Sequence, residues 1–358
     1  MKGEVALIYS DRYLGHQPPL DHPERPNRLI IALEALKSMN LLQQLLMVEP
    51  LKAVEEEVTI VHNLEYVRMV RDFSRIGGGL LDSDTYIVED TYDVALLAVG
   101  GVLKGLRDIL SNRYSKAFVL ARPPGHHVGF KGRALNAPTQ GFCLFNNIAI
   151  GAKHLLNYGF ERIAIVNIDC HHGNGTQEIF YKTPNILYIS MHQDPETLYP
   201  GTGFLDEIGE EEGVGYNVNI PLPPGSGDDV CLEVIREVIS PILNEFKPEI
   251  ILVSAGFDGY KGEPLGDLNI TSYGYAQLFN TLIDIAERYS KGRILAVLEG
   301  GYNIGLTRAL PATISTLLKT RIKLDTPSRS KRFIMSKTRS IINKLSKLLR
   351  SYWTSLNP

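Results

Sequence analysis

The chain has 358 residues, of which 44% are hydrophobic and 22% charged, and its formal net charge is −3. This composition is that of a water-soluble globular protein, and the length allows one large domain or two ordinary ones. No stretch reaches the roughly 18 apolar residues that a membrane-spanning helix needs, which excludes a helical membrane protein. The cysteines Cys143, Cys170 and Cys231 are too few and too scattered for a disulfide framework.

The N-terminal sequence argues against export. Met1–Glu4 lead directly into the apolar segment Val5–Tyr9, which is too short for a signal-peptide core and has no cleavage site. Together with the cysteine usage, this predicts a reducing, cytoplasmic location.

Predicted strands and helices alternate along residues 1–320, and no internal repeat or Ser/Gly-rich linker interrupts them. The alternation predicts a single α/β domain, a three-layer sandwich whose mostly parallel central sheet carries helices on both faces. The predicted strands are Val5–Tyr9, Ala117–Ala121, Ile163–Asp169, Ile186–Met191, Tyr216–Ile220, Ile250–Ala255 and Ile294–Glu299. The predicted helices are Glu24–Met39, Thr91–Leu110, Asn146–Asn157, Asp229–Phe246 and Ser272–Tyr289.

Two polar segments lie early in the chain. The segment His22–Pro26 precedes the first helix, and Glu24 and Pro26 suit a first helical turn, so we interpret it as an ordinary helix start with Arg25 in an ion pair. The loop Leu81–Tyr86 carries two acids, which at a pocket rim could hold a substrate backbone N–H; a solvated loop is the plainer interpretation.

The segment Asn167–Gly175, with the sequence NIDCHHGNG, carries the strongest chemical signal. It lies between a predicted strand and a short helix that begins in Thr176–Tyr181. Asp169 and His171 therefore lie at the C-terminal end of a central strand, where open α/β sheets build their sites. Residues i and i+2 of an extended segment point to the same side, so a carboxylate and an imidazole are aimed at one point. Burying them without partners would be costly, and we interpret them as half of a metal site.

A second strand end carries the segment Arg122–His127, with the sequence RPPGHH. Two prolines and a glycine predict a rigid, non-helical turn. This turn presents His126 and His127 at the same sheet edge as Asp169. Histidine is the side chain whose pKa suits proton transfer near neutrality, so the tandem pair indicates acid/base chemistry.

Several motifs in one order resemble the histone deacetylase and acetoin-utilisation superfamily of metal-dependent amidohydrolases, which has the arginase/deacetylase fold. The resemblance covers about residues 3–320, and so many motifs in one order are far more specific than a single short pattern. They are PPGHH (Pro123–His127), GFCLFNN (Gly141–Asn147), DCHHGNG (Asp169–Gly175), YISMH (Tyr188–His192), YPGTG (Tyr199–Gly203), SAGFD (Ser254–Asp258) and LEGGY (Leu298–Tyr302).

The resemblance implies a catalytic metal held by Asp169, His171 and Asp258. Three protein ligands leave an open position for water and substrate, as a catalytic site requires. Zinc is the metal that the family implies, and Fe²⁺ tolerates the same ligands. His172 and Asp267 have suitable side chains, but neither falls on a family ligand position.

The resemblance also implies the acid and base. His127 would take a proton from the attacking water and later protonate the leaving amine, while His126 would stabilise charge and hydrogen-bond the water. Tyr302, in a Gly-Gly-Tyr loop at another strand end, would polarise the amide carbonyl and bind the oxyanion.

Four further positions would shape the substrate channel. Phe142 and Tyr199 would form two aromatic walls of a narrow channel that takes an unbranched alkyl chain. The Gly141 carbonyl would face the acetamide N–H, and Asp84 aligns with a rim acid that grips the substrate backbone.

Two asparagines need separate attention. Asn174 stands behind His127, as in part of the family, but Asn167 stands behind His126 where most members carry Asp. An amide orients an imidazole without raising its pKa as a carboxylate would, so we expect lower histidine pKa values and weaker activity. The family also implies a monovalent cation such as K⁺ at Ser190 and Met191, and Asn167 would remove a negative charge from it.

The C-terminal segment 321–358 is basic. It carries ten Lys or Arg and one acid, Asp325, a net charge of +9 that leaves −12 for residues 1–320. Within Lys331–Trp353 apolar residues recur at helical spacing, which predicts a basic amphipathic helix. It could pack on its own body, on a second subunit or on an anionic surface, and we favour packing on a protein surface.

We therefore expect a deacetylase that hydrolyses an N-acetyl amide on a linear amine, with acetyl-lysine of proteins as the leading substrate. One alternative is an amidohydrolase for acetylpolyamines or other small acetamides. The other is a binding module that holds acyl-lysine with little turnover. A ureohydrolase with a two-metal cluster would need additional Asp ligands, and the sequence does not contain those motifs. No base-specific contact with nucleic acid is expected.

Overall fold

The computed structural model describes residues 5–19 and 21–356. The segment Met1–Glu4, used above to argue against a signal peptide, and the last two residues of the basic tail lie outside this range. No helix in the described part of the chain is long and apolar enough to cross a membrane.

An eight-stranded, all-parallel sheet forms the centre of the molecule, in the order β10-β9-β8-β11-β12-β5-β1-β2. The two central strands, β11 and β12, consist almost entirely of Ile, Val, Leu and Ala and are buried on both faces, as parallel strands under two helical layers must be. The strands are β1 (Val5–Ile8), β2 (Leu46–Val48), β5 (Lys116–Val119), β8 (Ile163–Asn167), β9 (Ile186–Gln193), β10 (Asn217–Leu222), β11 (Ile250–Ala255) and β12 (Ile294–Leu298). The short pairs are β3 (Gly78–Leu80) with β4 (Tyr86–Val88), and β6 (Val128–Gly129) with β7 (Gly132–Arg133).

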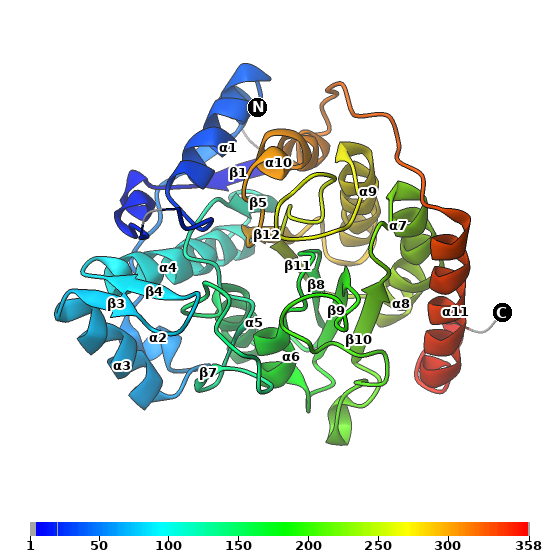
Figure 1. Ribbon diagram of the computed structural model, residues 1–358, viewed down its shortest axis with the longest axis horizontal. Coiled ribbons are helices and arrows are strands. Elements are labelled where there is room, and N and C mark those ends of the chain that lie inside the picture. The colour runs from blue at the N-terminus through cyan, green and yellow to red at the C-terminus, as the bar shows by residue number, and fades with distance from the viewer. Residues whose placement is uncertain (1–4, 20, 357–358) are drawn as a thin grey trace.

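Helices cover the sheet in two layers, so the predicted three-layer α/β sandwich is confirmed. In Figure 1, α1, α10, α9 and α7 lie on one side of the strands, and α4 and α5 lie on the other. The helices are α1 (Asn27–Ser38), α2 (Glu55–Val58), α3 (Leu64–Arg75), α4 (Thr91–Leu110), α5 (Asn147–Asn157), α6 (Asn174–Phe180), α7 (Asp228–Val234), α8 (Ser240–Phe246), α9 (Ser272–Tyr289), α10 (Ile304–Leu317) and α11 (Arg332–Leu349).

The structure departs from the sequence prediction in several elements. The strand β2 and the helices α3 and α10 were not predicted; β2 has only three residues, and α10 contains Pro311, which argues against a helix in sequence. The helix predicted over Asp229–Phe246 is interrupted by a π-turn at Ile235–Ile239. Pro241 explains it, because proline donates no N–H and its ring crowds the carbonyl four residues earlier.

The start of α1 also differs. The helix begins at Asn27, and Arg25 is exposed, with no ion pair to any residue of 5–19 or 21–356. Glu24 is instead fully buried and pairs with Arg28 at 3.1 Å and with Arg122 at 2.7 Å. Arg28, four residues along the chain, and the distant Arg122 supply the charge that this buried carboxylate needs.

The basic tail forms the helix α11 and packs against its own body. Ile334, Ile342, Leu345 and Leu349 are buried in the main hydrophobic core. The helix lies beside β10, and the indole nitrogen of Trp353, which follows it, donates a hydrogen bond to the Gly215 carbonyl at 2.8 Å. Contact of the solvent-facing side of α11 with a second subunit or an anionic surface stays a prediction.

Candidate metal centre and substrate cavity

Four neighbouring strands bring the predicted site residues together. The strands β8, β11, β12 and β5 are adjacent in the sheet and parallel, so their C-terminal ends lie at one edge. Asp169 and His171 follow β8, and Asp258 follows β11. Tyr302 follows β12, and the tandem histidines follow β5. The fold therefore gathers at one place residues that are up to 176 positions apart in the chain.

The three predicted metal ligands converge. The Nδ1 atom of His171 lies 3.0 Å from an oxygen of Asp169 and 3.0 Å from an oxygen of Asp258. Both carboxylates are fully buried, and backbone N–H groups of Gly300 and Cys170 hold their outer sides at 2.7 and 2.9 Å. Two buried negative charges facing one imidazole need a positive partner, so the residues fit a divalent cation.

The pKa of His171 supports the same conclusion. Burial alone would lower it, but hydrogen bonds to Asp169 and Asp258 raise the pKa of His171 well above its usual value. Without a cation the carboxylates thus draw a proton onto this imidazole. A metal ion would take the place of that proton, because metal-ligating histidine is neutral.

Three other residues with side chains able to bind a metal are not part of the proposed ligand set. The sulfur of Cys170 lies 3.4 Å from Nδ1 of His171. Burial, and then the neighbouring Asp258, raise the pKa of Cys170 well above its usual value, so its thiol is un-ionised. An un-ionised thiol is a poor metal ligand. Both ring nitrogens of His172 are engaged, by Thr202 and Gln177 at 2.9 Å each. Asp267 is exposed. These contacts agree with leaving His172 and Asp267 out of the ligand set.

The tandem histidines are buried side by side, with ring centroids 3.9 Å apart. The Nδ1 atom of His127 lies 2.8 Å from Oδ1 of Asn174, whose amide nitrogen donates to the Ala134 carbonyl at 2.9 Å. Since the amide nitrogen must face that carbonyl, the amide oxygen faces the imidazole and accepts from Nδ1–H. The lone pair of His127 therefore lies on Nε2, the atom available to act as a base.

His126 is held in a similar way. Its Nδ1 lies 3.2 Å from Oδ1 of Asn167, and its Nε2 lies 3.9 Å from Asp169. Burial, reinforced by the nearby His171, lowers the pKa of His126 to about 3, and burial likewise lowers the pKa of His127 well below its usual value. The lowering comes from burial and the neighbouring histidines, whereas the hydrogen bonds to Asn167 and Asn174 raise these pKa values. The expected difference from Asp-bearing relatives stays a prediction.

Two charged residues that sequence reasoning missed hold the loop of Tyr302. Glu263 accepts hydrogen bonds from three backbone N–H groups of the loop and the following helix: Tyr302 at 2.8 Å, Asn303 at 3.1 Å and Gly305 at 2.7 Å. Arg28 donates to the Gly301 carbonyl at 2.7 Å and places its guanidinium 4.8 Å from the centre of the Tyr302 ring. The loop is thus fixed from both sides.

A cavity of about 240 Å³ opens onto His127 and His171. Among its lining residues, Asp84, Gly141, Phe142, Tyr199 and Tyr302 were predicted, whereas Leu198 and Leu265 were not. The aromatic rings stand edge to face: Phe142 is 6.0 Å from Tyr302, and Tyr199 is 4.9 Å from His127, between ring centroids. The structure therefore brings the predicted channel residues to the metal ligands.

Gly141 has to be glycine at this position. Its φ is +55°, and a Cβ atom there would lie 2.6 Å from the ring of His127 and 2.9 Å from the ring of Tyr199. Any side chain would thus push into the cavity between two of its walls. The hydroxyl of Tyr199 donates to the Thr139 carbonyl at 2.9 Å, which fixes the opposite wall.

Asp84 lies at the cavity as predicted and is half-buried. Its carboxylate accepts hydrogen bonds from the hydroxyls of Thr139 at 2.5 Å and Thr85 at 2.9 Å, and its carbonyl accepts from His22 at 2.9 Å. Burial raises the pKa of Asp84, and Asp82 beside it adds to the effect.

Comparison with known proteins gives consistent matches. A sequence model of the histone deacetylase domain matches residues 22–317. The chain belongs to the histone deacetylase family. It is 44% identical over 311 residues to a probable deacetylase of Archaeoglobus fulgidus, covering 86% of this chain and 84% of that one. It is 35% identical over 292 residues to a histone deacetylase-like amidohydrolase of Pseudomonas aeruginosa, with 80% and 74% covered.

A solved structure extends the likeness to the whole chain. The crystal structure of the HDA15 HD domain superposes with a TM-score of 0.88 at 34% identity and covers 99% of this chain and 96% of that domain. The full-length Arabidopsis thaliana histone deacetylase 15 is 36% identical over 319 residues, and the chain spans about 55% of its length. These matches show that the chain has the deacetylase fold and belongs to a family of hydrolases.

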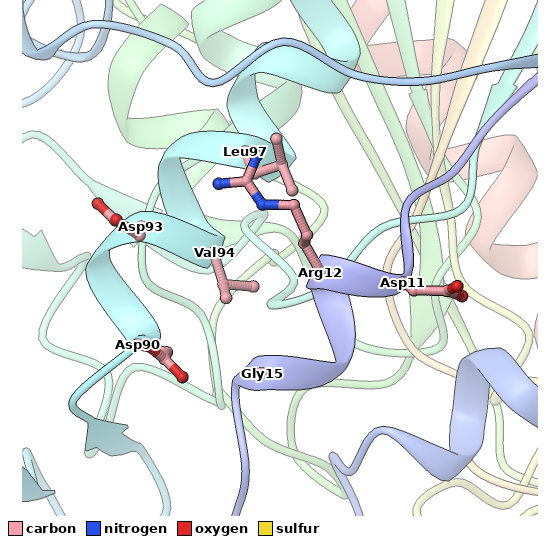
Figure 2. A pocket seen from close by; sticks show the side chains of 7 residues that line it. All are labelled: Asp11, Arg12, Gly15, Asp90, Asp93, Val94 and Leu97. Atoms are coloured by element: carbon pink, nitrogen blue, oxygen red, sulfur yellow. The ribbon is translucent and has the colours of Figure 1, made fainter.

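A second cavity of this histone deacetylase domain, about 320 Å³, lies between the segment Asp11–Gly15 and the start of α4. Figure 2 shows Arg12 lying along Leu97, while the carboxylates of Asp11, Asp90 and Asp93 point in different directions. All three acids are exposed. This cavity lacks the convergent, buried ligands of the first one.

Proposed function

We propose that the protein hydrolyses the N-acetyl amide of a linear amine, with acetyl-lysine in proteins as the substrate. The observation that carries this proposal is the cavity lined by His127 and His171, because the imidazole of His171 lies against the two buried carboxylates of Asp169 and Asp258 and the lone pair of His127 is on Nε2. The walls are aromatic and aliphatic, which suits the methylene stem of a lysine. The polar groups lie where the acetamide would stop.

We propose the following roles for the residues of this site. His127 removes a proton from the attacking water through Nε2 and later gives a proton to the departing amine. His126 holds the water in place and shares the charge. Tyr302 donates its hydroxyl to the carbonyl oxygen as that oxygen becomes negative. Asp84, at the rim, accepts a backbone N–H of the substrate.

The metal ligands in this proposal are Asp169, His171 and Asp258. A bound Zn²⁺, or Fe²⁺ with the same ligands, would supply a Lewis acid that lowers the pKa of water and polarises the acetyl carbonyl. The neutral histidines would leave the base form available at neutral pH, and the loop held by Glu263 would keep Tyr302 over the carbonyl.

The experiment measures hydrolysis of a fluorogenic acetyl-lysine peptide and of acetylated polyamines by protein reconstituted with Zn²⁺ or Fe²⁺. We expect turnover of the peptide. Replacing one buried ligand in Asp258→Asn should reduce kcat/KM by more than about a thousandfold, roughly 4 kcal/mol. Asp267→Asn is the matched control, since this carboxylate is exposed and hydrogen-bonds only weakly to Gln193 at 3.4 Å.

The outcomes separate the alternatives. Faster turnover of acetylated polyamines than of the peptide would assign the enzyme to small acetamides. Tight binding of acetyl-lysine peptide to metal-loaded protein without turnover would establish the binding module. Equal loss of activity in Asp258→Asn and Asp267→Asn would contradict the proposed ligand set.

A further inference from the structure

Asn167 lies at the centre of a hydrogen-bond chain behind the metal ligands. Its amide nitrogen is 3.1 Å from the Ser190 hydroxyl and 3.1 Å from the His171 carbonyl. Its amide oxygen faces His126, and Ser190 continues to His192 at 2.9 Å. We name this series, His126–Asn167–Ser190–His192–Gly203, the hydrogen-bond chain; all four of its side chains are buried.

The direction of every bond in the hydrogen-bond chain follows from its far end. The Gly203 carbonyl can only accept, so Nε2 of His192 at 3.0 Å carries the hydrogen. Burial lowers the pKa of His192 to about 4, so the ring is neutral and its Nδ1 accepts from the Ser190 hydroxyl. The Ser190 oxygen must then accept from Asn167, which turns the amide nitrogen toward Ser190 and the amide oxygen toward His126.

This orientation conflicts with a monovalent cation. The family resemblance would place such an ion against the Ser190 hydroxyl, and the His171 carbonyl lies 3.1 Å from the same amide nitrogen as that hydroxyl. Both face the two N–H bonds of the Asn167 amide, and a cation cannot share that position with N–H donors. These residues therefore do not fit K⁺, although the family resemblance implies it.

We propose that the Asn167 amide takes the place of the monovalent cation, so that this histone deacetylase works and folds independently of K⁺. One neutral amide satisfies the oxygens that a cation would otherwise bind. It also holds the Nδ1–H tautomer of His126, which keeps the Nε2 lone pair toward the site. The role assigned to His126 rests on the proposed function; the absence of a cation requirement does not.

The test compares melting temperatures in KCl and in choline chloride at equal ionic strength. We expect the wild-type protein to melt at the same temperature in both salts, because the Asn167 amide occupies the position where K⁺ would bind. Asn167→Asp presents a carboxylate to the Ser190 and His171 oxygens, so we expect it to be destabilised in choline and to gain about 5 °C or more in K⁺ with saturable dependence.

Asn174→Asp is the matched control. It adds the same charge behind the other histidine, but its side chain faces the His127 ring and one carbonyl oxygen, that of Ala134, so we expect no K⁺-specific gain. A saturable stabilisation of the wild-type protein by K⁺ would overturn the proposal, whether or not the enzyme turns over any substrate.

A second measurement does not depend on a variant that folds. In ¹⁵N NMR spectra of the wild-type protein, the hydrogen-bond chain requires a protonated Nδ1 and an unprotonated Nε2 on His126, and the reverse on His192. Finding the opposite tautomer on either ring would contradict the chain. Wild-type activity equal in both salts would then extend the conclusion from stability to catalysis.

Discussion

Charged side chains serve opposite purposes in two regions of this molecule. At the C-terminal edge of the sheet, Asp169 and Asp258 are fully buried, and each lies within reach of His171. On α11 the charges are exposed: Lys337, which pairs with Asp194 at 2.9 Å, has 53% of its side-chain surface accessible. Burial, more than the presence of an ion pair, therefore decides how much free energy a charged side chain adds or costs.

Loss of the oxyanion donor at the C-terminal edge of the sheet should have a large effect on catalysis. In Tyr302→Phe the oxyanion donor is lost while the ring and its packing on Arg28 remain. We expect kcat to fall by about 10²–10³, with little change in melting temperature. Steady-state kinetics with an acetyl-lysine peptide provides the measurement. An unchanged kcat would remove Tyr302 from the proposed machinery.

A change of pH dependence should follow from Asn174→Asp. Burial lowers the pKa of His127 in the native protein, so the base form persists below the ordinary histidine pKa. A carboxylate partner favours the imidazolium and raises the pKa, so the base form is lost earlier as the pH falls. We expect the acid limb of kcat/KM to move up by about one to three pH units. An acid limb of kcat/KM that does not move would show that protonation of His127 does not control the rate.

The apolar side of α11 should matter through packing alone. Leu345 is fully buried, and Leu348, one turn along, is 38% exposed. We expect Leu345→Ala to lower the free energy of unfolding by about 2–5 kcal/mol, and Leu348→Ala by far less. Denaturant unfolding measures both. Similar losses in the two variants would mean that the helix does not dock in the observed orientation.

The smallest effect should come from the exposed ion pair. Lys337→Ala removes the pair with Asp194, and we expect a loss below about 1 kcal/mol that shrinks further at high salt. Thermal melts at low and high ionic strength measure it. A loss as large as that of Leu345→Ala would erase the contrast between the two regions.

The sequence predicted the parts of the site that depend on nearby residues. Asp169 and His171 are two positions apart at a strand end, and His126 and His127 follow another strand, so the parallel sheet was enough to place them at one edge. The resemblance to deacetylases supplied Asp258 and Tyr302. The structure brings these residues to one edge of the sheet, and their roles stay predictions.

Partners that are distant in the chain could not be predicted. Glu263 and Arg28 hold the loop of Tyr302 from segments 39 and 274 positions away, and no local pattern marks either of them. The same holds for Leu198 and Leu265 in the cavity wall. The orientation of the Asn167 amide depends on His192 and the Gly203 carbonyl, which only the folded chain brings into line.

The position of α11 has a consequence for aggregation. The strand β10 is the outermost strand at one end of the sheet, and one side of such a strand presents backbone groups able to pair with another molecule. With α11 packed beside it and Trp353 bonded to Gly215 just before it, that side is shielded from incoming strands. We therefore expect proteolytic removal of the tail to promote self-association through β10, even where the C-terminal ends of the strands, with the metal ligands, stay intact.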